Sequence, residues 1–205
     1  MKIRIGNVLL LALLAVVLPV SAQNSSPDAL IRNTVDEVVA VLKQDDGIRA
    51  GNQDKVLSLI REKILPHFIF TRMTQLAMGK NWSLAGPEQK KSLVKEFRTL
   101  LVRTYSNSLT TYRDEVIKVS PTNVGSQDTK ATVKTLVIQG SGKQPVPIDY
   151  AMEKSDSTWK VYDVTVAGVS LVTNYRGTFN SQVRDGGVDG LITALAEKNA
   201  SMRGK

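Results

Sequence analysis

The apolar residues of this chain change their spacing twice, and this change constrains the fold more than any other feature of the sequence. Before Asp114 they recur at i, i+3, i+4 and i+7, the spacing of amphipathic helices. From Asp114 to Val166 they alternate or form short β-branched runs, which are typical of strands. After Gly168 the helical spacing returns. Helices, an antiparallel meander and helices again predict a single α+β domain.

Several helices are expected before the strands, each with a start or stop signal. A capping Ser and a Pro at the first helical position mark a start at Ser26-Pro27-Asp28, and Asp45-Asp46-Gly47 marks the end of that helix. Asn52 caps a second helix that Pro66 closes. A third, shorter helix spans Thr71 to Met78.

The longest helix begins at Gly86-Pro87-Glu88. Its broad apolar face consists of Leu93, Phe97, Leu100, Leu101, Tyr105 and Leu109. We expect this helix to pack on the sheet. Near the C-terminus, Gly186-Gly187 is expected to separate two short amphipathic helices.

Strand-like runs follow the long helix and are separated by turn residues. The expected strands are Val116 to Val119, Ala131 to Ile138, Ile148 to Met152 and Trp159 to Val166. In the third run, apolar residues alternate with Asp149, Ala151 and Glu153, as one buried and one wet face require.

The N-terminus reads as a secretory signal peptide, residues 1–22, followed by one domain over residues 23–205. Lys2 and Arg4 precede the apolar run Val8 to Leu18, and Val20-Ser21-Ala22 offers small residues for cleavage. That run is too short to span the ~30 Å of a bilayer core. The chain has no Cys, so export brings neither disulfides nor a lipoprotein anchor.

The charge balance favours anionic partners without indicating nucleic acid. Without Lys2 and Arg4 the 27 basic residues become 25, against 19 acidic ones, which leaves a net charge of +6. These charges are spread along the chain, and no aromatic-plus-Arg motif of an RNA or DNA reader is present. Lipid headgroups or acidic protein surfaces therefore fit an exported protein better.

No catalytic or metal motif stands out. His67 is the only histidine, and its place between Pro66 and Phe68 favours a structural or surface role. Gly168-Val169-Ser170 lacks the second Gly of a nucleophile elbow, so a strand end or tight turn is expected. The segment 185–190 lacks the ligand spacing of a calcium loop, and the chain has too few Cys and His for a transition-metal site. We therefore expect no catalytic residue, no metal and no cofactor.

Several segments, in this order along most of the mature chain, carry a resemblance to a known family. They are Ile64 to Phe68, the helix from Pro87 to Tyr105, Tyr162-Asp163, Gly168-Val169-Ser170 and Gly187 to Leu191. Together they resemble the MlaC family, also called the toluene-tolerance Ttg2 family, of periplasmic phospholipid-binding proteins of Gram-negative bacteria.

The resemblance implies a curved antiparallel sheet with helices around an apolar pocket, similar to the cone of nuclear-transport-factor-like proteins. It also implies a periplasmic carrier that moves phospholipid, its cargo, between the outer and inner membranes and maintains outer-membrane asymmetry. The implied partners are a lipid-extracting lipoprotein complex at the outer membrane and an inner-membrane ABC transporter complex with a periplasmic ring.

The walls of that pocket are expected to come from the long helix, the strands and the segment that follows them. The candidate lipid-binding residues are Leu93, Phe97, Leu101, Tyr105, Val137, Tyr150, Met152, Tyr162, Val164, Val169, Leu171 and Phe179. Residue types alone do not distinguish such walls from an ordinary filled core.

Two other classes of function remain open at this point. An enzyme on a cone-shaped fold would need acid or base residues in the pocket, and Asp149 and Asp163 are the candidates. For Asp163 we instead expect a structural role, in which its carboxylate accepts hydrogen bonds from backbone N–H groups or a basic side chain near Gly168. A periplasmic adaptor with a filled core would act only through protein contacts.

Overall fold

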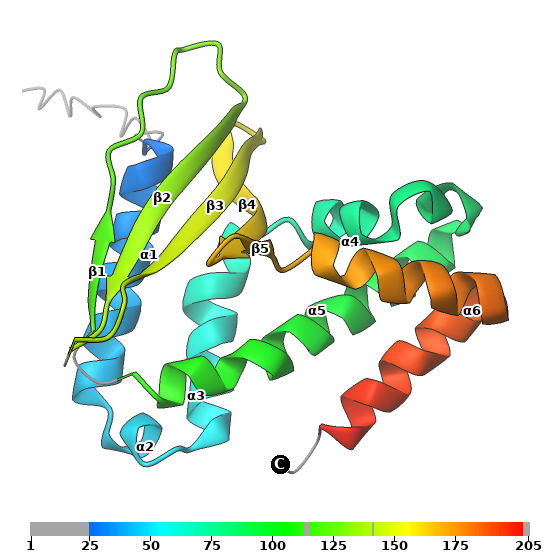
Figure 1. Ribbon diagram of the computed structural model, residues 1–205, viewed down its shortest axis with the longest axis horizontal. Coiled ribbons are helices and arrows are strands. Elements are labelled where there is room, and N and C mark those ends of the chain that lie inside the picture. The colour runs from blue at the N-terminus through cyan, green and yellow to red at the C-terminus, as the bar shows by residue number, and fades with distance from the viewer. Residues whose placement is uncertain (1–24, 113–114, 141, 203–205) are drawn as a thin grey trace, which may run out of the picture.

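The long helix α5 (Pro87–Thr110) links a sheet region to a helical region in the computed structural model, which describes residues 25–112, 115–140 and 142–202 (Figure 1). The signal peptide expected over residues 1–22 lies outside these residues. The described helices are α1 (Pro27–Gln44), α2 (Asp46–Arg49), α3 (Gln53–Leu59), α4 (Phe70–Met78), α5 and α6 (Arg176–Ser201).

The helix starts follow the expected capping chemistry. The Ala29 N–H donates to Ser26 Oγ over 3.3 Å at the start of α1, and Lys55 N–H donates to Asn52 Oδ1 over 3.1 Å at the start of α3. After α3 the hydrogen-bonding pattern widens to a π-helical turn over Ile60–Ile64 and then tightens to a 3₁₀ turn over Leu65–His67. The second expected helix thus reaches Pro66, but only its first part is α-helical.

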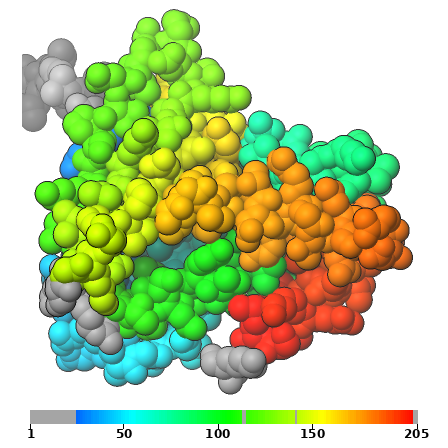
Figure 2. Space-filling view, viewed as in Figure 1, coloured from blue at the N-terminus to red at the C-terminus, as the bar shows by residue number. Residues whose placement is uncertain are grey.

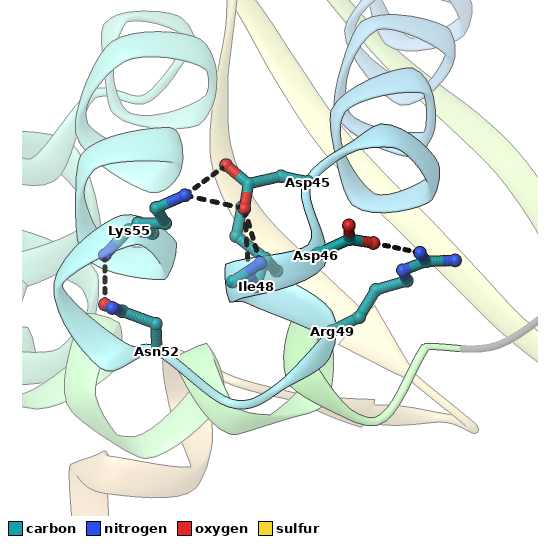
Figure 3. Close-up of polar contacts among 7 residues, drawn as sticks. Asp45, Asp46, Ile48, Arg49, Asn52 and Lys55 are labelled. Atoms are coloured by element: carbon teal, nitrogen blue, oxygen red, sulfur yellow. Dashed lines mark hydrogen bonds and ion pairs between the residues drawn. The ribbon is translucent and has the colours of Figure 1, made fainter.

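Asp45 fixes the corner where α1 turns into α2 and α3 (Figure 3). Its Oδ1 accepts the N–H groups of Gly47 at 2.8 Å and Ile48 at 3.1 Å, and Lys55 Nζ lies 2.9 and 3.0 Å from its two carboxylate oxygens. The hydrogen bond from Lys55 is the main reason that the pKa of Asp45 lies below its usual value. This corner sets the direction of α3 relative to α1.

The sheet has five antiparallel strands in sequence order, and it confirms the expected α+β class. The strands are β1 (Val116–Val119), β2 (Lys130–Ile138), β3 (Val146–Ser155), β4 (Thr158–Val166) and β5 (Val169–Ser170). All four expected strands are present, and β5 is an addition. Ala167 and Gly168, with φ of 48° and 85°, form the tight turn between β4 and β5, as expected for this segment.

A β-bulge interrupts the pairing of β3 with β4. Ala151 pairs with Asp163, but the next residue, Met152, pairs with Val161, so β4 has one extra residue, Tyr162. A bulge bends its strand and increases the local twist. It also changes which side chains of β4 face the interior, with consequences for the site.

The helix on the inner face of the sheet is α1, not the long helix. Helix α1 contacts β1, β2 and β4, and Ile31 is buried with Val133, Val161 and Trp159. The expectation that α5 packs on the sheet was wrong, because the N-terminal half of α5 packs against α4 and α6 instead. Only the C-terminal half of α5 reaches the region below the sheet (Figure 1).

The helical region has a closely packed core. Phe97 of α5 contacts Tyr175 and Phe179 edge to face, with ring centroids 5.1 and 5.0 Å apart. Helix α6 bends at Gly187, whose φ of 67° and ψ of −170° are not helical, so the expected break is confirmed. The bend lets both halves of α6 bury apolar residues, among them Val183 and Leu191.

Candidate functional site

Two apolar cavities lie between the sheet and the helices. The larger, about 470 Å³, lies between α1 and the inner face of the sheet, with Ile148 and Tyr150 of β3 in its wall. The smaller, about 180 Å³, lies between the π-helical turn, the C-terminal half of α5, and Val164 of β4. The molecular surface is hollowed between the strands and α5, with residues of the N-terminal helices at the floor of the hollow (Figure 2).

The smaller cavity offers almost no hydrogen-bonding groups. The Ser106 hydroxyl in its wall donates to the Arg103 carbonyl over 3.3 Å and so already has a partner. The Tyr105 hydroxyl interacts with Tyr175, and burial is the main reason that the pKa of Tyr105 is raised. Such a wall suits an alkyl chain and no polar group.

The larger cavity combines apolar walls with a set of polar side chains. The polar and titratable side chains in its wall are Thr34, His67, Ser108, Thr111, Tyr112, Glu115, Gln139 and Tyr150. No Lys or Arg lines either cavity in the described part of the chain. Walls of this composition fit a ligand that has a long apolar part and a polar end, which can meet uncharged groups, one imidazole and one carboxylate.

Burial shifts the pKa of two titratable groups in the larger cavity. Burial lowers the pKa of His67, with Lys160 acting in the same direction and Glu37 opposing it, so the imidazole is neutral at pH 7. Burial raises the pKa of Tyr150, although a hydrogen bond with Thr135 acts in the opposite direction. The Tyr150 side chain is only partly exposed, and its place in the cavity wall accounts for this exposure.

Six of the twelve candidate lipid-binding residues lie in the cavity walls. The smaller cavity is lined by Leu101, Tyr105, Val164 and Leu171, and the larger one by Val137 and Tyr150. They come from α5, β2, β3, β4 and the segment after β5. The structure brings these six residues together around the two cavities, and their contact with lipid remains a prediction.

Three of the other candidates belong to the helical core. Leu93, Phe97 and Phe179 are at most 1% exposed and pack among α4, α5 and α6, away from both cavities. Their place follows from the packing of α5, whose N-terminal half turns its apolar face to α6 rather than to the strands. Neither cavity wall includes these three residues.

The last three candidates are also outside the cavity walls, for reasons that lie in the strands. The bulge puts Val161 and Val164 in cavity walls and turns Tyr162 away, so that the Arg72 guanidinium carbon lies 6.0 Å from the centre of its ring. Met152 is fully buried within the sheet core, and Val169 is 55% exposed on the short strand β5.

Neither carboxylate of the enzyme hypothesis lines a cavity. Tyr150 faces the larger cavity, so its neighbour Asp149 points to the opposite face of the sheet. Asp163 accepts the Ser170 hydroxyl at 2.6 Å and the backbone N–H groups of Val164 at 2.8 Å and Val172 at 3.3 Å. The structural role expected for Asp163 is confirmed, because this carboxylate fixes the chain that leads from β5 to α6.

The described residues contain no group of three or more His, Cys, Asp or Glu side chains that could hold a metal ion. No helix among them is both long and apolar enough to cross a membrane.

Sequence reasoning missed two sets of cavity residues. One is the apolar stripe of α1, with Ile31, Val35 and Val38, which the sequence analysis did not assign to a cavity. The other is Ile64 and Phe68, which lie in one of the segments that carry the family resemblance. The helical spacing of Ile31, Val35 and Val38 is a signal that could have pointed to α1, whereas no sequence signal indicated Phe68.

Comparison with known proteins identifies the family. The sequence profile of the MlaC protein family matches residues 32–197. The chain belongs to the MlaC family. The intermembrane phospholipid transport system binding protein MlaC of Haemophilus influenzae is 23% identical over 179 residues, which cover 84% of this chain and 82% of that protein. The toluene tolerance protein ttg2D of Pseudomonas putida is 26% identical over 183 residues, 88% and 83% of the two chains.

A solved structure of an MlaC-family relative has the same fold. The phospholipid-binding protein from Ralstonia solanacearum, determined in complex with a phospholipid, is 37% identical to this chain and aligns with a TM-score of 0.79. The alignment covers 87% of this chain and 99% of that one. The expected resemblance to the MlaC family is thus confirmed by sequence and by structure.

Proposed function

We propose that this protein is a phospholipid carrier that moves lipid between the outer and inner membranes and so maintains outer-membrane lipid asymmetry. The observation that carries the proposal is the pair of adjoining apolar cavities, in a chain of the MlaC family whose structural relative holds a phospholipid. The residues that we assign to lipid contact are Leu101, Tyr105, Val137, Tyr150, Val164 and Leu171.

The physical task of such a carrier is to keep acyl chains out of water. Two chains carry about 30 methylenes, and at ~0.8 kcal/mol each their burial is worth on the order of 20 kcal/mol. A membrane gives the lipid nearly the same stabilisation, so the carrier mainly lowers the barrier for crossing the aqueous space. The direction of transport is then determined by the partners.

The partners and the location belong to the same proposal. The mature domain, residues 23–205, works in the periplasm after cleavage of the signal peptide. It receives lipid from, or gives it to, an outer-membrane lipoprotein complex and an inner-membrane ABC transporter complex. It catalyses no reaction and uses no cofactor, and the placement of Asp149 and Asp163 away from the cavities supports this part of the proposal.

The test of the carrier function is the lipid content of the purified mature protein, measured by native mass spectrometry. We expect co-purified phospholipid in the wild-type protein and a loss of about tenfold or more in Leu101→Glu, because the variant places an unpaired carboxylate among acyl chains. Leu101→Met keeps an apolar side chain of similar volume and serves as the matched control.

The outcomes separate the three classes of function. A wild-type protein without lipid, in a compact fold, supports the adaptor. A hydrolytic activity on the bound lipid supports the enzyme. Unchanged lipid content in a folded Leu101→Glu variant contradicts the assignment of this cavity.

Docking to the two membrane complexes is expected to be transient and partly electrostatic. The mature chain has a net charge of +6, and salt screens exposed charges over ~8–10 Å. Lipid exchange with the partner complexes should therefore slow as ionic strength rises, while lipid already bound stays in place. Exchange rates that do not respond to salt would mean that apolar contacts around the cavity opening carry the docking.

A further inference from the structure

The side chain of Phe68 stands between the two cavities. In the described chain, three residues line both: Ile64 at the end of the π-helical turn, Phe68, and Leu109 of α5. The two spaces therefore adjoin, and these three side chains form the boundary between them. We call this set the divider.

The backbone holds Phe68 in place on both sides. The Phe68 N–H donates to the Leu65 carbonyl over 3.1 Å, and the Ile69 N–H donates to the Val161 carbonyl over 2.9 Å, which ties the segment to β4. The ring also stacks on Phe70, with centroids 5.9 Å apart and planes 22° apart. The backbone of Phe68 is thus held in place, and the stack on Phe70 orients its ring.

The two sides of the divider differ in chemistry. The larger cavity has hydroxyl, amide, imidazole and carboxylate groups in its wall, whereas the smaller one has apolar walls apart from Tyr105 and the satisfied hydroxyl of Ser106. The polar end of a lipid therefore belongs to the larger cavity. An acyl chain that extends inward from there meets the Phe68 ring before it reaches the smaller cavity.

We propose that Phe68 determines the length of the acyl chain that the larger cavity accepts, by ending that cavity at the divider, while the other acyl chain of the lipid occupies the smaller cavity. This inference rests on the proposed carrier function and adds a selection among lipids. A chain that fits up to Phe68 is wholly shielded, and each methylene beyond that limit stays outside the cavity. Because a membrane shields every methylene, each one left in water weakens retention by about fourfold.

The experiment is a competition between lipids that differ only in chain length. The mature protein is equilibrated with vesicles of phosphatidylethanolamines that carry saturated chains from lauroyl to stearoyl in equal amounts, and the bound species are measured by mass spectrometry. For the wild-type protein we expect a sharp decline above one chain length. For Phe68→Ala, which joins the two cavities, we expect the preferred length to shift upward by several carbons.

Two further variants make the result specific. Leu109→Ala removes the divider from the side of α5 and leaves the tie to β4 intact, so it should shift the preferred length in the same direction even if Phe68→Ala fails to fold. Val102→Ala enlarges only the smaller cavity and keeps the stack of Phe70 on Phe68, so the decline should stay at the wild-type length.

The possible results are distinct. A wild-type length profile in folded Phe68→Ala and Leu109→Ala overturns the inference. An equal shift in Val102→Ala also overturns it, because cavity volume rather than the divider would then set the length. A wild-type protein that takes up no lipid at all contradicts the carrier function itself.

Discussion

The helical region and the sheet region bury similar apolar residues, yet one is filled and the other contains cavities. In the helical region, Phe97, Tyr175 and Phe179 contact one another with ring centroids 5.0–5.8 Å apart. In the sheet region, Tyr150 and Val137 border the larger cavity. Helix α5 takes part in both regions. Its N-terminal half packs in the filled helical core, and its C-terminal half borders the cavities.

The difference arises from the geometry of the elements. Helices pack with axes 8–10 Å apart and interdigitate their side chains, so α4, α5 and α6 close on one another. A sheet whose strands bend at a bulge cannot stay in contact with one straight helix along its whole width. Helix α1 covers part of the inner face, and the space left between the strands, α5 and the π-helical turn forms the two cavities.

A matched pair of deletions tests this comparison most strongly. Leu191→Ala, in the filled helical core at 1% exposure, is expected to lower the free energy of unfolding by about 3–5 kcal/mol, since it creates a new cavity. Leu109→Ala borders space that already exists, so about 2 kcal/mol or less is expected. The measurement is urea unfolding of the delipidated variants, because bound lipid would add its own stabilisation.

Equal losses in the two variants would mean that the sheet region closes around Leu109 in solution. The comparison between a filled and a hollow region would then fail. Adding lipid back provides a second check, because it should stabilise the wild-type protein and Leu191→Ala by the same increment.

The sequence predicted the elements well, because each has a local signal. Ser26, Asn52 and Pro87 mark helix starts, and alternation around Tyr150 marks a strand. The break at Gly187 was also predicted, since a double glycine rarely stays helical. The short strand β5 was not, because two residues carry no period.

Half of the candidate residues lie in the cavity walls, and the position of the others has physical causes. The period of α5 shows which residues are buried but not which partner buries them, so Phe97 and Leu101 looked equivalent. Strict alternation along β4 would put Tyr162 on the inner face, but the bulge at this residue reverses the alternation. No residue type in β4 indicates that a bulge is present. Phe68 lies in an irregular segment between two helices, where periodicity gives no orientation.

Asp163 offers a test of the junction between the two regions. Its carboxylate holds Ser170 and the N–H of Val172, in the segment that leads from the sheet to α6. Asp163→Asn replaces one acceptor oxygen by an amide that cannot accept the Ser170 proton, so a loss of about 1–3 kcal/mol of unfolding free energy is expected. Thermal unfolding measures it, with Ser170→Ala as the matched variant on the other side of the bond.

If the junction only connects two independently folded regions, the Asp163→Asn variant should unfold in two steps. A single transition shifted to lower temperature indicates that both regions unfold together. A stable variant that had lost a hydrolytic activity would instead support the enzyme hypothesis.

The smallest expected effect concerns His67 in the wall of the larger cavity. Burial lowers its pKa in the folded protein, whereas the unfolded chain has the ordinary value of about 6.5. As the pH falls below about 6.5, the unfolded chain binds a proton that the folded protein does not, so the free energy of unfolding decreases until the pH passes the lowered pKa.

The contribution of His67 to the free energy of unfolding is present in full above about pH 6.5 and is lost as the pH falls. The carboxyls of Glu37 and Asp45 also have lowered pKa values, but they titrate below this window. His67→Gln, which keeps a polar side chain without a proton to gain, should therefore flatten the change in urea midpoint between pH 7.5 and about 5.5. An unchanged pH dependence in the variant would mean that the imidazole is as solvated in the folded protein as in the unfolded chain. The His67 side chain would then be exposed to solvent and not buried in the cavity wall.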